Sequence, residues 1–344
     1  MTLTWGLVLL AAVVLASVLV HGWWRVRRAT PARQRAEPAR GPGPRIDPAV
    51  DLAPEPEPEP EPPPPRPLLR RIARLDPLID AIVPILLETR VSGDHVLACM
   101  PASRRAGSKP FYIEGLDAES GEWASPVAGG LYSELQAGVQ LANRSGALNE
   151  IEYSEFVQKV QDFVDDVGGL PDFPDMLEVV ARARELDAFA HPVDAQLTIT
   201  LRSDAVAWSV GYVRQCAARH GFADGTLPGR LVLPAATEGD PPVLVLSFDP
   251  QAALADDPQQ AAVREIQLSL DVPQTAAEAE PFPAWHGAAR ALCDDMAATA
   301  VDDFGEPITL HAFNTIGHEL QALYTQLEAH GMPAGSAAAR RLFS

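Results

Sequence analysis

The chain has 344 residues and a formal net charge of -19, with 27 basic residues against 46 acidic ones. A nucleic-acid partner is therefore disfavoured, because phosphate contacts require clustered Lys and Arg. The length is enough for one or two domains with accessory segments. Cys99, Cys216 and Cys293 lie far apart among apolar neighbours, a pattern typical of buried reduced thiols rather than of a metal site or a disulfide framework.

A continuous apolar segment near the N-terminus predicts one membrane-spanning helix. Residues 3–22 contain no charged side chain and are long enough to cross the hydrocarbon core. Trp23 and Trp24 follow, as interfacial residues do, and five arginines lie between positions 25 and 35. The positive-inside rule then leaves the N-terminus outside and the bulk of the chain in the cytoplasm. The alternative is a cleaved signal peptide, which would have its positive charge before a shorter apolar region.

The segment that follows, residues 29–67, is predicted to be a disordered linker. Its last part, residues 54–67, alternates Pro with Glu and then has a run of prolines before Arg66 and Pro67. Pro favours the polyproline II conformation and the glutamates repel one another, so this composition builds no core. Such a linker can hold a domain on the order of 100 Å from the membrane.

The second half of the body, residues 194–332, has the clearer pattern. Residues 266–272 (IQLSLDV) alternate apolar and polar side chains, as a strand with one buried face does. Helices are indicated by apolar stripes at helical spacing and by a glycine after the last periodic residue, as at Gly221 and Gly331. The predicted strands are 196–201, 230–233, 243–248 and 266–272, and the predicted helices are 211–220, 284–300 and 316–330.

The first half, residues 78–190, follows a similar order. Residues 135–141 (LQAGVQL) parallel residues 266–272, and a pair of helices follows each segment. An internal duplication of the fold is therefore a hypothesis. The predicted strands are 81–91, 110–116 and 135–141, and the predicted helices are 150–167, 174–189 and a short one within 94–106, where Pro101 interrupts the pattern.

This order of elements predicts an α+β fold. The helices would cover one face of a mostly antiparallel sheet, in a split β-α-β arrangement that is possibly duplicated. The other sheet face would be open to solvent or to a ligand, and such a face can accept an extended or helical peptide.

The segments DAQLTITL, CAARHGF, LVLSF, IQLSLDVP and HELQALYTQLEAHGM, all within 194–332, occur in an order that resembles the FtsZ-binding C-terminal domain of the cell-division protein ZipA. The layout of one span, a Pro-rich linker and a C-terminal domain is also similar to that family. The resemblance implies a divergent, non-enzymatic adaptor in the bacterial inner membrane. It would bind the C-terminal tail of FtsZ, tether the division ring and concentrate at midcell. Residues 78–190 have no counterpart in the better-known members.

In that family the open sheet face forms a shallow apolar groove for the FtsZ tail. Carried over by strand position, the resemblance assigns the following partner-binding residues: Thr198, Arg230, Val232, Val243, Val245, Ser247 and Ser269. Thr198, Ser247 and Ser269 are smaller and more polar than the family's groove residues. We therefore expect weaker binding of an aliphatic tail, or a different partner, and a plain solvated face is the competing interpretation.

Patterns typical of catalysis or cofactor binding are missing from the sequence. No phosphate-binding loop, nucleophile elbow or HExxH motif occurs, so neither an enzyme nor a cofactor is expected. His311 and His318 lie near acidic residues, but the predicted strand or loop over 308–313 would separate them, and ordinary surface histidines are expected. The alternative functions are a membrane-anchored scaffold for another envelope or division partner and, from a different class, a cytoplasmic enzyme.

Overall fold

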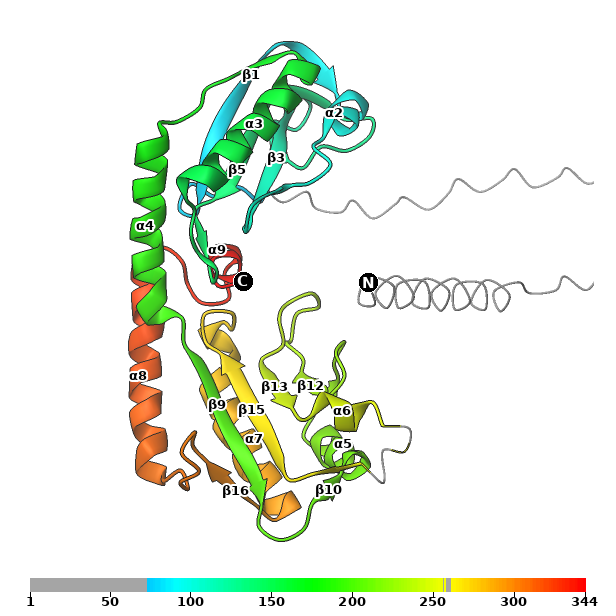
Figure 1. The fold of residues 1–344 in the computed structure, drawn as a ribbon, viewed down its shortest axis with the longest axis vertical. Helices are drawn as coiled ribbons and strands as arrows, with labels where there is room; N and C mark the ends of the chain where they lie inside the picture. Colours follow the sequence, from blue (N-terminus) through cyan, green and yellow to red (C-terminus); the bar gives the residue numbers. More distant parts are fainter. Residues whose placement is uncertain (1–72, 256, 258–260) are drawn as a thin grey trace, which may run out of the picture. The chain divides into compact units, whose positions relative to one another are not determined.

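The computed structural model describes residues 73–255, 257 and 261–344, which form an α+β fold with antiparallel sheets, as the sequence predicts (Figure 1). The predicted span at 3–22 and the linker at 29–67 lie outside the described residues. Within the described ranges, no helix is both long and apolar enough to cross a membrane.

The first sheet has the strand order β2-β3-β5-β1-β8, with β4 paired to β3. Its buried face follows from period-2 alternation, which directs Ala81, Val83 and Ile85 of β1 into the core. The strands are β1 (Asp80–Ser92), β2 (Arg105–Ala106), β3 (Lys109–Asp117), β4 (Trp123–Ala124), β5 (Leu131–Gln140) and β8 (Gly169–Pro171); β6 (Ala142–Asn143) and β7 (Gly146–Ala147) form a separate hairpin.

Helix α3 (Glu150–Val167) covers the buried face of this sheet. Asn149 caps it with a full capping box, because its side chain accepts from backbone N–H groups while the Glu152 carboxylate accepts from the Asn149 N–H. Phe156 packs edge-on against Phe111 of β3, with ring centroids 5.5 Å apart. The other helices of this half are α2 (Gly93–Cys99), which ends before Pro101, and α4 (Met176–Val193).

The second sheet has the order β11-β12-β13-β15-β9-β16, and Figure 1 shows α7 along one side of β9 and β15. Trp285 of α7 is buried and donates from Nε1 to the Leu268 carbonyl at 3.2 Å. The strands are β9 (Gln196–Ser203), β11 (Ala223–Asp224), β12 (Arg230–Leu233), β13 (Leu244–Ser247), β15 (Glu265–Asp271) and β16 (Ala298–Val301), with β10 (Trp208–Ser209) and β14 (Ala262–Val263) as a separate pair. The helices are α5 (Val210–Arg219), α6 (Pro250–Ala253), α7 (Pro281–Met296), α8 (Leu310–Ala329) and α9 (Ala337–Leu342), with a 3-10 turn at Ala277–Ala279.

Two sequence predictions in this half are wrong. The helix predicted over 284–300 ends at Met296, because Ala297 adopts a left-handed conformation (φ 49°) and the chain continues as β16. The strand or loop predicted over 308–313 is helical from Leu310 onward, since the Thr309 side chain accepts from the Ala312 N–H and starts α8. The edge strand β8 of the first half was not predicted either.

The two sheets share a central strand order, β3-β5-β1-β8 in the first and β13-β15-β9-β16 in the second. Their registers also correspond, because Ile85 pairs with Leu135 and Leu201 pairs with Ile266, the first residues of the two segments aligned from sequence. Both α3 and α7 end at a left-handed residue that leads directly into the edge strand. This likeness supports a common plan, while duplication itself stays a prediction.

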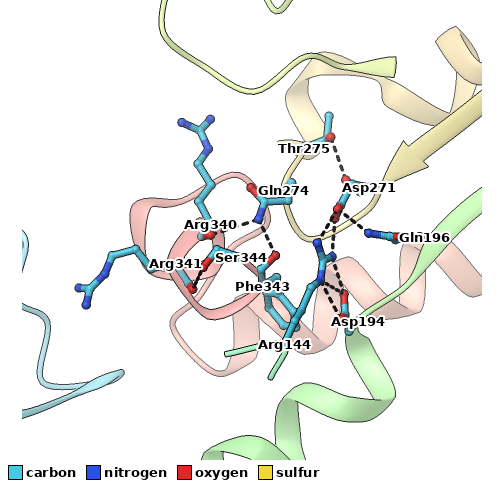
Figure 2. Close-up of polar contacts among 10 residues, drawn as sticks. All are labelled: Arg144, Asp194, Gln196, Asp271, Gln274, Thr275, Arg340, Arg341, Phe343 and Ser344. Atoms are coloured by element: carbon cyan, nitrogen blue, oxygen red, sulfur yellow. Dashed lines mark hydrogen bonds and ion pairs between the residues drawn. The ribbon is translucent and has the colours of Figure 1, made fainter. Parts of the chain in front are cut away.

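Ionic contacts join residues of the first half to residues of the second (Figure 2). Arg144 lies in the β6–β7 turn and pairs with Asp194 at 2.6 Å and Asp271 at 2.8 Å. Arg341 of α9 pairs with the fully buried Asp80 at 2.5 Å. Gln274 donates to the carbonyls of Arg340 and Phe343 and so fixes α9.

Candidate functional site

Six of the seven predicted site residues lie on one face of the second sheet, in two adjacent rows. Val232, Val245, Ser269 and Thr198 pair in sequence across β12, β13, β15 and β9. The next row places Arg230 beside Ser247, followed by Gln267 and Thr200. Thr198 and Arg230 are exposed, and the other four predicted residues are half-buried.

Val243 does not belong to this face. It is 9% exposed and packs in the hydrophobic core of the second half. The prediction extended the period-2 alternation of β13 backwards, but the strand begins at Leu244 and two prolines precede Val243. The backbone therefore leaves the regular pleat before this residue, and its side chain turns inward.

The face is open on the side opposite α7. Its members alternate with Ile199, Leu268 and Leu246, which are buried on the helix side. Within the described ranges, no helix lies over the two rows (Figure 1). The side chains on this solvated sheet face are therefore accessible to another chain.

The chemistry of this face is mainly polar, and its side chains contact one another. The Thr198 hydroxyl donates to the Ser269 hydroxyl at 3.1 Å, and Gln196 donates to Asp271 at 2.9 Å. At the far end Arg202 pairs with Glu265 at 2.8 Å, with both side chains about half exposed. Only Val232 and Val245 offer apolar surface in the central row.

A groove of about 550 Å³ adjoins the face along β12. Asp224 of β11 and Arg230 and Val232 of β12 form its sheet side, and two loops form the rest. One loop is held in place because Asp240 pairs with Arg340 of α9 at 2.7 Å, and the hydrogen bond from Arg340 lowers the pKa of Asp240. The loop residues that sequence reasoning missed include Thr226, Pro234, Ala235 and Pro242, since no periodic pattern identifies a loop side chain that lines a groove.

The cysteines Cys99, Cys216 and Cys293 are free, and burial raises the pKa of the Cys293 thiol to about 11, which makes it a poor nucleophile at neutral pH. Among the described residues, no group of three or more His, Cys, Asp or Glu side chains is placed to hold a metal ion.

A buried cation, Lys109, was also missed. It is fully buried and donates from Nζ to the Ser108 hydroxyl at 2.9 Å and to Asn143 Oδ1 at 2.7 Å. Burial lowers the pKa of Lys109, and the nearby Glu152 carboxylate opposes that effect. The Lys109 ammonium group connects β3 with the β6–β7 hairpin and lies near Glu152 at the start of α3, so its contacts are structural.

No family model matches the chain, and no curated protein matches it. The candidate site therefore depends on the geometry described above and on the resemblance drawn from the sequence segments.

Proposed function

We propose that this chain is a ZipA-like, membrane-anchored adaptor that binds the FtsZ C-terminal tail and tethers the division ring to the inner membrane. The observation that supports the proposal is the open row formed by Val232, Val245, Ser269 and Thr198 on four adjacent strands. A short peptide can lie across such a face and extend into the groove beside β12.

The small apolar area of the row limits its affinity for a peptide. Burial of apolar surface contributes roughly 25 cal/mol per Å², and two half-buried valines supply little of it. Most of the remaining free energy must come from polar contacts to residues such as Arg230 and Ser247. We therefore expect micromolar or weaker binding.

The rest of the chain suits a tether. The predicted helix at 3–22 would anchor the protein with its N-terminus in the periplasm, and the predicted linker at 29–67 would let the body reach a ring held away from the membrane. No catalytic role or cofactor is proposed.

Val245→Asp tests the face directly. A carboxylate in the centre of the row would have to be desolvated under the bound peptide, so the variant should lose capture of the FtsZ tail in a pull-down. Val206→Asp is the matched control, because Val206 is 73% exposed in the same half and lies outside the two rows. Equal capture by wild type and Val245→Asp would place the site elsewhere.

A second candidate function follows from the polarity of Thr198, Ser247 and Ser269. A polar face favours a partner other than an aliphatic tail, so the chain would be an anchored scaffold for a different envelope or division protein. A fluorescent fusion in dividing cells separates the two functions. A midcell band supports the division adaptor, and a uniform membrane signal supports the scaffold.

A further inference from the structure

The outer face of the first sheet carries a row of apolar side chains that the second sheet lacks. Across β8, β1, β5, β3 and β4 the paired residues are Leu170, Leu86, Glu134, Leu116 and Trp123. Leu86 is 59% exposed and Leu170 is 67% exposed. In the second sheet the positions equivalent to Leu86 and Leu170 by register are Arg202 and Thr299. The apolar surface is thus particular to the first half.

Glu134 lies at the centre of this row and lacks a cation there. Its equivalent in the second sheet, Glu265, pairs with Arg202 at 2.8 Å. No basic side chain from the described part of the chain pairs with the exposed Glu134. The row therefore offers apolar contacts on both sides of one negative charge, which suits a segment that alternates apolar and basic residues.

The chain itself enters this face at its first described residues. The backbone N–H groups of Arg74 and Leu75 donate to the buried Glu114 carboxylate of β3, the latter at 3.3 Å. The Leu75 side chain lies on Gly138, where an added Cβ would come within 2.5 Å of Leu75 Cδ2 and the leucine would have to shift. Arg74 also lies over the Tyr112 ring, 5.5 Å from its centroid.

The residues immediately before this point have the matching composition. Residues 67–72 are Pro-Leu-Leu-Arg-Arg-Ile, with three large apolar side chains around two arginines. From Gly138 to Glu134 is four residues along β5, or about 13 Å, and six extended residues span up to about 20 Å. The segment is long enough to reach the row from its fixed end at Arg74.

We infer that residues 67–72 bind in cis to the outer face of the first sheet. Leu68, Leu69 and Ile72 supply the apolar side chains, and an arginine of the segment pairs with Glu134. The first sheet face is then occupied by the chain's own segment, while the open face of the second sheet stays available. This inference does not depend on which partner the second face binds.

Limited trypsin digestion of the full chain tests the inference. Trypsin cleaves after Arg70 and Arg71 but not after Arg66, which precedes Pro67, and cleavage after Arg45 in the linker provides an internal reference. Docked residues must detach before cleavage, so the double variant Leu86→Asp/Leu170→Asp should raise cleavage at Arg70 and Arg71 relative to Arg45 by about tenfold. Val206→Asp should leave the ratio unchanged.

A second variant keeps the test independent of any damage to the sheet. Leu68→Ser/Leu69→Ser leaves the folded face intact and should give the same loss of protection. Equal ratios in wild type and in this variant would overturn the inference. A wild-type protection that rises with protein concentration would also overturn it, because the occupant would then be a second copy rather than the same chain.

Discussion

Helices α3 and α7 both end at a residue in the left-handed conformation, but this residue is a glycine in α3 and an alanine in α7. Gly168 has φ 82° and Ala297 has φ 49°, and each is followed at once by an edge strand. A Cβ at Gly168 would meet no atom within 4 Å, so any cost of a side chain there is conformational. Left-handed backbone costs a non-glycine residue about 1–2 kcal/mol, and Ala297 carries that strain.

Ala297→Gly should therefore stabilise the protein by about 0.5–1 kcal/mol, because relief of the strain exceeds the greater entropy of glycine in the unfolded chain. Gly168→Ala should destabilise it by about 1 kcal/mol for the opposite reason. Urea denaturation of both variants measures the two changes. A loss of stability in Ala297→Gly would show that the alanine methyl group makes contacts that outweigh the strain.

Glu152 is a buried carboxylate whose contribution to stability should depend on pH. Burial raises the pKa of its carboxyl, but hydrogen bonds from the Ser108 backbone and hydroxyl and from the Asn149 backbone, with the charge of Lys109, lower it below its usual value near 4.5. The carboxylate thus favours the folded state above that value. This contribution is lost as the pH falls through the lower, folded-state pKa.

Glu152→Gln should cost about 1–2 kcal/mol at neutral pH, since hydrogen bonds to a charged acceptor are replaced by weaker ones. The difference in unfolding free energy between wild type and variant should shrink below about pH 4.5. Urea titrations at several pH values between 7 and 3 follow this difference. A difference that stays constant with pH would contradict the role assigned to the carboxylate.

Among the elements, the β6–β7 turn helps to join the two halves, because Arg144 contacts both Asp194 and Asp271. Burial alone would lower the pKa of Arg144, but hydrogen bonds and charge from the two aspartates raise it by more. The net pKa is therefore raised, and the guanidinium stays charged. The three side chains are each 28% exposed, so this cluster is shielded from water more than the Arg202–Glu265 pair of β9 and β15.

Arg144→Gln should destabilise the protein by about 1–3 kcal/mol, because Asp194 and Asp271 would then face each other without a cation. Arg202→Gln removes one exposed ion pair and should cost under about 1 kcal/mol. Denaturant midpoints at low salt compare the two. Equal costs would mean that the cluster contributes no more than a surface pair.

Element type was largely predictable from the sequence, whereas element ends and loop contacts were not. The helix predicted over 150–167 has the observed bounds, because Asn149 and Gly168 mark its ends in the sequence. Strand β16 was absorbed into a predicted helix, since alanines in 297–300 continue the helical composition and only tertiary pairing with β9 makes them extended. The two rows of the candidate face could be predicted from the alternation of apolar and polar residues. The prediction for Val243 was wrong because the regular strand begins only at Leu244.

At the scale of the whole molecule, the two halves share a central strand order but present different surfaces. The second sheet presents a polar row that ends at a groove, and the first presents an apolar row on the same face that Leu75 contacts at Gly138. This difference could not be predicted without the registers, because neighbours on a face come from strands far apart in sequence.

The most direct test of the proposed function is a titration of the FtsZ C-terminal peptide, fluorescently labelled, with residues 67–344, which form one compact unit. The account predicts saturable binding by wild type and by Leu86→Asp, and loss of binding in Val245→Asp. Anisotropy that does not change with the wild-type protein, or that changes equally with Val245→Asp, would contradict it.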